Sequence, residues 1–328
     1  MRADLEASIT VAGKPTPGES VEELIAWARA KLGFGPERRW ELISSRNKLR
    51  KIFFEIEEVT PESKTRLIGK VSRSDRSKGA FESLLTVWDS GFRPPSIYTV
   101  VRPVAYLEER KLLLQEKAPG LPLLDFIRRR DEKAEEMTCR AARWLCALHG
   151  GSIAALPFDG ESAVVERCKT ELTEDSRGSR ERIGEIADCI SSKLAARGPT
   201  NWVPSHGDFH PMNVFLAEHG RVTVIDFDTF SARERAADVA YFLAQAAIMG
   251  YLDKGSFNAT SGVRSAFLAE YQRSARCEFD AARLGLYIAL AFLQSLHFET
   301  CILHTGNSSI VDPWLKSAEQ CLEGDIEL

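Results

Sequence analysis

The sequence lacks several motifs by which nucleotide-binding and metal-binding proteins are most easily identified. Neither G-x-x-x-x-G-K-[ST] nor G-x-G-x-x-G occurs in its 328 residues, which argues against P-loop and Rossmann nucleotide sites. Its seven cysteines include no C-x-x-C pair, so neither a zinc ribbon nor a thioredoxin-like redox site is indicated. The chain also shows no internal repeat and no low-complexity tract.

Charge and hydropathy exclude further classes. Lys and Arg number 43 against 47 Asp and Glu, a formal net charge of −4, so there is no general basic field for nucleic acid and a small partner is expected. The N-terminus lacks the basic and apolar regions of a signal peptide, and the longest apolar stretches, near 239–252 and 284–296, are too short to cross a bilayer. We therefore expect a cytoplasmic protein without a membrane segment. The sequence does not indicate an oligomeric state.

Length and patterning predict two lobes. A chain of 328 residues exceeds the usual size of a single core. Residues 1–18 mix Gly, Pro and charge without periodicity and are expected to form an arm. Residues 19–117 then predict a β-rich lobe: a helix at 21–32, strands at 40–44, 51–57 and 66–71, a helix at 78–89, and a hairpin of 98–106 with 111–117.

The remaining residues, 118–328, predict a larger lobe that is mostly helical. The tripeptide Ala118-Pro119-Gly120 breaks the pattern and marks the hinge between the lobes. Apolar periodicity beyond it predicts helices near 123–130, 134–149, 179–196, 237–249, 263–276, 281–301 and 313–322.

The chemistry centres on the segment 205–213, which reads Ser-His-Gly-Asp-Phe-His-Pro-Met-Asn. Asp208 and Asn213 stand five positions apart, and Asp226 follows thirteen residues later at the end of the apolar run 222–225. Phosphoryl transfer needs a carboxylate that orients the attacking hydroxyl, and an amide and a second carboxylate that hold Mg²⁺. The spacing of these three residues is that of a kinase centre.

The segment 205–213 is also compatible with two other interpretations. A polar loop with Pro and Gly before a strand is also typical of an ordinary turn, with His206 and His210 capping backbone carbonyls. A zinc site on the same two histidines is disfavoured, because H-x-x-x-H normally works on a helix beside a further ligand and Pro211 indicates a loop.

The pattern H-G-D-x-H-P-x-N followed by I-D-F-D resembles the aminoglycoside phosphotransferase and choline kinase family, relatives of the protein kinases that phosphorylate small molecules. Met212 departs from the Gly that the family usually has before the Asn. The resemblance implies an α+β, bilobal protein-kinase-like fold, with ATP and Mg²⁺ as cofactors. It makes Asp208 the catalytic residue and Asn213 and Asp226 metal ligands. If the extended conformation continues past Asp226, strand alternation brings Asp228 to the same face, as a further metal contact or a surface acid.

For the nucleotide, the resemblance makes Lys70 in the third strand the lysine that contacts the phosphates, with Glu82 on the following helix as its partner. Considered alone, the two residues would read as solvated surface charges. Ser45 and Asn47 lie in a glycine-free turn between the first two strands, where the family places a phosphate-covering loop; a plain hairpin turn is the alternative.

Three further residues are candidates for the adenine site, namely Gln115, Glu116 and Lys117 at the hinge, where backbone groups would pair with the purine edge. An ordinary strand end is the alternative there.

The residues around the loop are given supporting roles by the same resemblance. His206 would hold the loop by hydrogen bonding, and Asp238, in a D-[LV]-A motif, would anchor it from the start of a helix. The expected function is ATP- and Mg-dependent phosphorylation of a hydroxyl on a small molecule, such as an aminoglycoside, an amino alcohol or a sugar. A non-catalytic kinase-like accessory protein and a peptide kinase remain open as alternatives.

Overall fold

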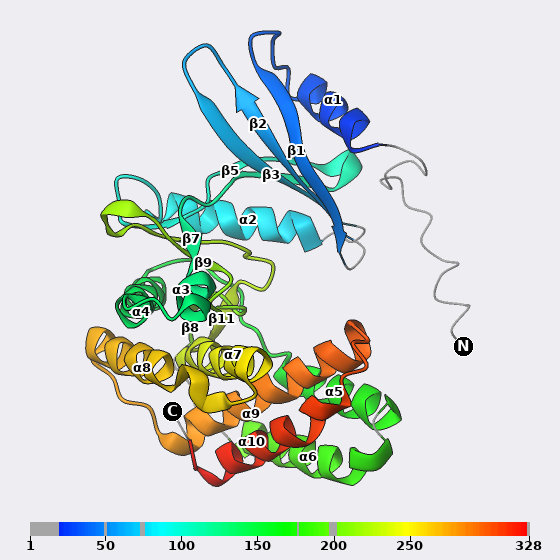
Figure 1. Ribbon diagram of the computed structural model, residues 1–328, viewed down its shortest axis with the longest axis vertical. Helices are drawn as coiled ribbons and strands as arrows, with labels where there is room; N and C mark the ends of the chain where they lie inside the picture. The colour runs from blue at the N-terminus through cyan, green and yellow to red at the C-terminus, as the bar shows by residue number, and fades with distance from the viewer. Residues whose placement is uncertain (1–19, 49–50, 73–75, 176, 197–201, 327–328) are drawn as a thin grey trace. The chain divides into compact units, whose positions relative to one another are not determined.

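The computed structural model describes residues 20–48, 51–72, 76–175, 177–196 and 202–326 (Figure 1). The chain divides into two compact units, the first made of Met1–Arg93 with Val100–Ala118 and the second of Pro94–Thr99 with Pro119–Leu328. The first unit thus ends at Ala118, the first residue of the expected hinge and one residue beyond the expected boundary at 117, and the short segment Pro94–Thr99 belongs to the second unit. The expected arm at 1–18 lies outside the described residues.

The first unit is built on a five-stranded antiparallel sheet with the strand order β1-β2-β3-β6-β5. Its elements are α1 (Val21–Lys31), β1 (Arg39–Lys48), β2 (Lys51–Val59), β3 (Lys64–Ser72), α2 (Arg76–Asp89), β5 (Pro103–Leu107), a short 3₁₀ turn (Glu108–Arg110) and β6 (Leu112–Glu116).

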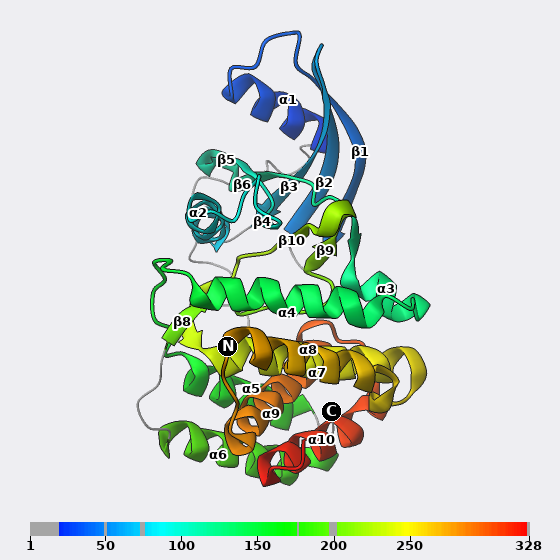
Figure 2. The ribbon, with the colours of Figure 1, turned by 90° about the vertical axis from the view of Figure 1, so that its left-hand side faces the viewer.

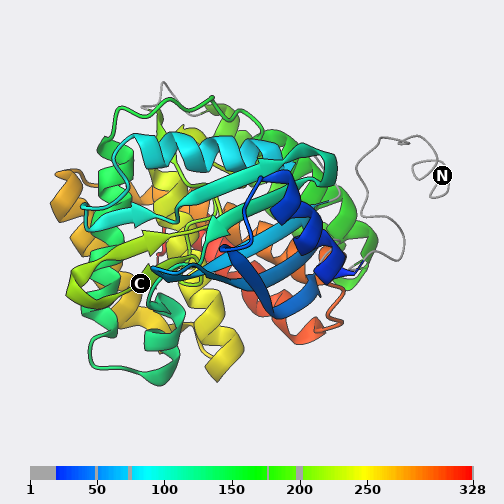
Figure 3. The same cartoon turned by 90° about the horizontal axis from the view of Figure 1, so that it is seen from above.

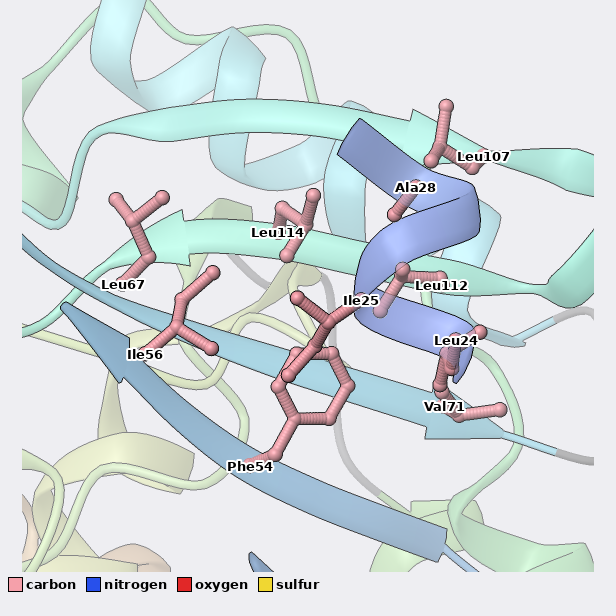
Figure 4. Close-up of a cluster of buried hydrophobic side chains, with 10 residues drawn as sticks. All are labelled: Leu24, Ile25, Ala28, Phe54, Ile56, Leu67, Val71, Leu107, Leu112 and Leu114. Atoms are coloured by element: carbon pink, nitrogen blue, oxygen red, sulfur yellow. The ribbon is translucent and has the colours of Figure 1, made fainter. Parts of the chain in front are cut away.

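Helix α1 covers one face of this sheet. It begins with a capping box, in which the Ser20 side chain accepts the N–H of Glu23 and the Glu23 carboxylate accepts the N–H of Ser20. Its apolar face packs on alternate residues of the strands, and Figure 4 shows the resulting core. Seen from above, the dark blue helix lies across the strands (Figure 3). The buried cluster consists of Leu24, Ile25, Ala28, Phe54, Ile56, Leu67, Val71, Leu107, Leu112 and Leu114.

Helix α2 packs against β3, β5 and β6. Phe81 stacks on Tyr106 with ring centroids 6.3 Å apart. Tyr106 alternates along β5 with Leu107, a member of the core under α1, so α2 lies on the opposite face of the sheet from α1. Lys70, which the sequence predicts to contact the phosphates, also projects from this face, because its neighbour Val71 belongs to the core under α1.

The second unit contains two small sheets and most of the helices. A four-stranded sheet has the order β4-β10-β9-β7, and β8 pairs with β11. The strands are β4 (Tyr98–Val100), β7 (Leu121–Pro122), β8 (Trp202–Ser205), β9 (Val214–Leu216), β10 (Val222–Val224) and β11 (Ser231–Glu234). The predicted strand 98–106 is therefore two strands in two sheets.

One helix before the segment 205–213 and one after it pack against β8, the strand that leads into that segment. In Figure 2 the green α4 and the gold α8 lie side by side. The α-helices are α3 (Leu123–Arg129), α4 (Ala134–Gly150), α5 (Glu161–Asp175), α6 (Arg180–Ala196), α7 (Arg235–Lys254), α8 (Ser261–Ala275), α9 (Ala281–His297) and α10 (Val311–Glu323). Helix α5 has no counterpart in the sequence prediction.

Helix α9 runs into a π-helical turn, Phe298–Ile302, and the combined span Ala281–Ile302 is long and apolar enough to cross a membrane. The prediction that this stretch is too short was therefore wrong on length. Its most apolar window is 72% buried inside the protein, because α9 packs against α5, α6, α7 and α10. Such burial is typical of a core helix, whose apolar surface is already covered by protein.

Candidate active site

The catalytic loop is anchored by a carboxylate at the start of α7. Asp238, which is 1% exposed, accepts hydrogen bonds from the backbone N–H groups of His206 and Gly207, each at 2.7 Å. The predicted anchoring role of Asp238 is therefore confirmed. Because both bonds go to consecutive residues immediately before Asp208, they fix the backbone that carries this carboxylate.

Two buried side chains, His149 and Tyr271, support Asp238 by hydrogen bonding. The Nε2 of His149 lies 3.1 Å from Asp238 Oδ2, and its Nδ1 lies 2.6 Å from the hydroxyl of Tyr271. Burial lowers the pKa of His149 despite the neighbouring carboxylate, so the ring is neutral, with Nε2–H donating to Asp238 and Nδ1 accepting from Tyr271. Burial raises the pKa of Asp238, but its hydrogen bonds and the nearby histidines outweigh burial and lower it. Asp238 is thus an anion that three N–H groups stabilise.

Gly207 is required by the shape of the loop. Its φ is +80°, and a Cβ at this position would lie 2.5 Å from the carbonyl oxygen of Thr229. The side chain of Thr229 also closes the loop, because its hydroxyl donates to the His206 carbonyl at 3.0 Å. Glycine after the histidine therefore has a steric cause, which explains His-Gly-Asp where the protein kinases have His-Arg-Asp.

His206 and Phe209 hold the loop from inside. His206 Nε2 lies 2.9 Å from the carbonyl oxygen of Ile225, and its Nδ1 accepts the N–H of Asp208 at 3.2 Å. Phe209 is fully buried and stacks on Trp144 of α4 with centroids 5.7 Å apart. The predicted support by His206 is confirmed. The role of Phe209 was missed, although a phenylalanine between an acid and a histidine in a polar loop is itself a signal of anchoring.

The loop brings Asp208 and Asn213 together. Asn213 Nδ2 donates to the Asp208 carbonyl at 3.0 Å and lies 3.3 Å from Asp208 Oδ2. His210 Nε2 lies 3.1 Å from the same nitrogen and 3.6 Å from Asp208 Oδ2. Because the amide nitrogen faces Asp208, the Oδ1 of Asn213 is the side-chain atom left to meet a cation. The zinc alternative is not supported, since His210 faces an amide and a carboxylate rather than His206.

The environment keeps Asp208 ionised. Burial raises its pKa, but the interaction with His210, whose Nε2 lies 3.6 Å from Asp208 Oδ2, outweighs burial, so the net pKa lies below the ordinary value. Tyr241 of α7 lies beside the same carboxylate and interacts with it electrostatically. Burial and this negative charge raise the pKa of Tyr241 well above its usual range. An anionic Asp208 beside a protonated phenol is suited to accept a proton from a hydroxyl.

Asp226 lies two residues beyond the end of β10 and has a φ of +72°, the left-handed region that non-glycine residues rarely adopt. Its negative charge acts on Asp208, raising the pKa of that carboxyl in part, which puts the two carboxylates in one neighbourhood. The strand ends at Val224, and Asp228 lies in a turn. The alternation expected for Asp228 required the strand to continue, and this condition is not met, because the chain leaves the extended conformation at Asp226.

The oxygen donors here suit a hard cation. Among the described residues no group of three or more His, Cys, Asp or Glu side chains is placed to hold a metal. A carboxamide and a carboxylate, completed by phosphate oxygens and water, are nevertheless the kind of incomplete protein set that Mg²⁺ uses. Asn213 and Asp226 fit such a site.

A pocket opens beside the catalytic loop within the second unit. Its lining includes Gly207, Tyr241, Glu161 and Arg233. The Arg233 guanidinium stacks 3.9 Å from the Phe158 ring centroid, with its Nε donating to a serine hydroxyl at 2.8 Å. The pocket thus combines aromatic, acidic and basic groups with Tyr241, which lies beside Asp208.

In the first unit, Lys70 and Glu82 do not lie on facing surfaces. Lys70 is 9% exposed in β3, with its Nζ 6.0 Å from the Phe53 ring centroid. The face of α2 that is buried carries Ala80 and Leu84, whereas Glu82 lies on the exposed face about half a turn away. The helix phase therefore does not support the predicted pairing of Glu82 with Lys70.

Ser45 and Asn47 are not in a loop. Strand β1 runs to Lys48, and Ser45 pairs with Phe54 in β2. A β-bulge between Leu42 and Ser44 shifts the register by one residue, which the alternating pattern did not reveal. The prediction that Ser45 and Asn47 lie in a phosphate-covering turn was therefore wrong, and residues 49–50 lie outside the described residues.

The hinge candidates are already engaged through part of their backbone. The N–H of Glu116 donates to Arg102 O at 2.9 Å, and that of Lys117 donates to Arg66 O at 2.8 Å. Gln115 is buried in β6, opposite Ile68. Among the described residues that follow Lys117, the first backbone N–H without a hydrogen bond is that of Ala118. The sequence analysis did not name Ala118 as an adenine-site candidate.

Comparison with known proteins places this fold and site. A model of the phosphotransferase enzyme family matches residues 59–287. The chain belongs to this family and is a phosphotransferase. A search of curated proteins finds no match.

Solved structures show the same protein-kinase-like fold at low sequence identity. The choline kinase LicA from Streptococcus pneumoniae is 14% identical, with a TM-score of 0.61, covering 93% of this chain and 98% of its own. The amicoumacin kinase hAmiN, solved in complex with AMP-PNP, Ca²⁺ and Ami, is 14% identical with a TM-score of 0.61, covering 98% of this chain and 96% of its own. A glucosamine kinase with glucosamine, ADP and inorganic phosphate is 18% identical with a TM-score of 0.58, covering 96% and 86%.

Proposed function

We propose that the protein transfers the γ-phosphoryl group of ATP, with Mg²⁺, to a hydroxyl group of a small molecule in the cytoplasm. The observation that carries the proposal is the contact between Asp208 and Asn213, whose amide nitrogen lies 3.0 Å from the Asp208 carbonyl and 3.3 Å from its carboxylate. That contact supports a pre-formed pair of a proton acceptor and a metal ligand.

The roles of the residues follow from their chemistry. Asp208 orients the acceptor hydroxyl and receives its proton, while Tyr241 lies beside the carboxylate. Asn213 Oδ1 and Asp226 would hold Mg²⁺, which when bound neutralises charge on the phosphate oxygens, and Asp228 is an additional candidate. Lys70 contacts the phosphates. In the hinge segment 115–118, the adenine edge would meet the Ala118 N–H and carbonyl groups, because the N–H groups of Glu116 and Lys117 are already bonded.

The pocket beside Gly207 is the proposed acceptor site. Its lining by Tyr241, which lies beside Asp208, and by a glutamate and an arginine supports a polar acceptor of small size. The neighbouring folds include kinases solved with glucosamine and with amicoumacin, which supports small molecules over peptides as acceptors.

The test separates catalysis from binding. MgATP affinity is measured by calorimetry, and ADP formation is followed over a panel of amino alcohols, amino sugars and aminoglycosides. We expect Asp208→Asn to bind MgATP but to lose transfer by about a thousandfold or more. Asp188→Asn, an exposed acid in α6, is the matched control and should behave as wild type. MgATP binding without turnover on any acceptor would instead favour the accessory-protein alternative, and turnover on peptides alone would favour a peptide kinase.

A further inference from the structure

Three side chains form a row across the sheet of the first unit. After the bulge in β1, Arg46 pairs with Phe53 in β2, and Phe53 pairs with Lys70 in β3. Residues directly opposite one another in antiparallel strands project from the same face. Without the one-residue shift of the bulge, Arg46 would project from the other face. The bulge therefore decides which way this arginine points.

The row lies on the face opposite α1. Phe54, Leu67 and Val71 belong to the core under α1 (Figure 4). Phe53 and Lys70 each neighbour one of them in sequence, and successive strand residues point to opposite faces. Arg46 thus shares a face with the lysine assigned to the phosphates, whereas Ser45, its predicted neighbour in that role, does not.

One aromatic ring holds both cations. The guanidinium carbon of Arg46 lies 5.5 Å from the Phe53 ring centroid, and Lys70 Nζ lies 6.0 Å from the same centroid. The two charges are therefore at most 11.5 Å apart, the sum of those distances. Two cations gathered on one ring repel each other, and an anion that contacts both removes that repulsion.

Arg46 differs from Arg66 and Lys117, two other basic residues of this face. Arg66 and Lys117 both form ion pairs with Glu55, at 2.7 and 2.9 Å. Arg46 makes no ion pair with any of the described residues. Arg46 is exposed near the C-terminal end of β1. Its guanidinium contacts the Phe53 ring and not a carboxylate.

We propose that Arg46 is a phosphate-binding residue, which donates hydrogen bonds from its guanidinium to the phosphate oxygens of the nucleotide whose phosphates Lys70 contacts. This inference rests on the proposed function. The sequence has no glycine-rich phosphate loop. The planar guanidinium of Arg46 would supply hydrogen-bond donors in place of the backbone N–H groups of such a loop. The ligand class is a nucleoside di- or triphosphate.

The experiment compares ligands that differ only in phosphate. Affinities of MgATP, MgADP and adenosine are measured by calorimetry on the full chain, for wild type, Arg46→Ala, Arg46→Lys and Arg46→Met. Arg39→Ala is the matched control, because Arg39 is an exposed arginine of the same strand, about 23 Å away along it. Thermal unfolding checks each variant, and Arg46→Met keeps an apolar stem on Phe53.

We expect Arg46→Ala and Arg46→Met to weaken MgATP and MgADP about tenfold while adenosine changes by less than about twofold. Arg46→Lys should fall between them and wild type, because it keeps the charge and loses the planar fork. MgATP binding by Arg46→Met within about twofold of wild type, or an equal loss for adenosine, would overturn the inference alone. Failure of the wild-type chain to bind MgATP would overturn the proposed function as well.

Discussion

The backbone N–H of Gly207 donates a hydrogen bond of 2.7 Å to the carboxylate of Asp238, which lies on a helix 31 residues later. With the matching bond from His206, this contact joins the catalytic loop to the first turn of α7. The position of Asp208 therefore depends on a buried anion that does not itself touch the reacting groups.

Asp238→Asn tests that dependence. Asparagine keeps one acceptor but sets an NH₂ group against a backbone N–H, so we expect the free energy of unfolding to fall by about 2–4 kcal/mol. Transfer should fall about a hundredfold, because a displaced loop misplaces the carboxylate. Urea denaturation and ADP formation measure the two effects, with Asp188→Asn as control. Unchanged turnover in a destabilised Asp238→Asn chain would show that the anchor serves folding only.

Gly207→Ala should be as disruptive. The new methyl group would meet the Thr229 carbonyl oxygen at 2.5 Å in a backbone conformation with a φ of +80°. We expect a loss of stability of about 1–3 kcal/mol together with lost transfer. Gly79→Ala in α2 is the control, since nothing lies within 4 Å of its added Cβ, and it should stabilise the chain by about 1 kcal/mol. Thermal melts that rank the two substitutions the other way would contradict the steric argument.

Sequence reasoning found the parts of the site that spacing encodes. Asp208, Asn213 and Asp238 lie in short motifs, and the structure joins them by hydrogen bonds. The order of strands and helices in the first unit was also legible, because apolar periodicity marks which face of each element is buried.

What the sequence could not give was register and phase. The bulge at Leu42/Ser44 turns Ser45 away and Arg46 toward the Lys70 face, yet an inserted residue leaves no mark in a polar strand. The pairing of Glu82 with Lys70 was predicted from the position of Glu82 in the sequence. The direction in which the Glu82 side chain projects depends instead on which face of α2 is buried against the sheet. Both errors concern orientation, which is fixed by tertiary packing.

The strand that carries Lys70 requires a small neighbour. A Cβ on Gly69 would lie 2.1 Å from the ring of Phe54, which is 2% exposed, so the ring crosses β3 at that point. We expect Gly69→Ala to cost about 1–3 kcal/mol of stability and to weaken MgATP by displacing Lys70.

Replacing the aromatic ring supplies the control for that substitution. Phe54→Leu alone leaves a cavity and should also lower the free energy of unfolding. The double variant Gly69→Ala/Phe54→Leu should lose less unfolding free energy than the sum of the two single losses. Urea denaturation of the four chains gives the coupling free energy. Strictly additive losses would mean that the two side chains do not compete for space.

The last prediction concerns acid stability and the packing of α4 on α8. Glu270 of α8 accepts from Arg143 Nε of α4 at 2.7 Å and also pairs with Arg273. Burial raises the pKa of Glu270, but these hydrogen bonds outweigh it and lower the pKa from 4.5 to about 2. A lowered folded-state pKa means that the stabilisation is present above pH 4.5 and is lost as the pH falls toward 2. Over that window it amounts to roughly 3 kcal/mol.

Glu270→Gln should therefore be less stable than wild type by up to roughly that amount, about 3 kcal/mol, at pH 7. The gap should narrow as the pH falls from about 5 toward 2, where wild-type Glu270 becomes neutral too. Urea denaturation at pH 7, 5, 4 and 3 measures it, with the exposed Glu132→Gln as control. A gap that stays constant across this series would mean that Glu270 contributes through packing, and that its charge does not hold α8 against α4.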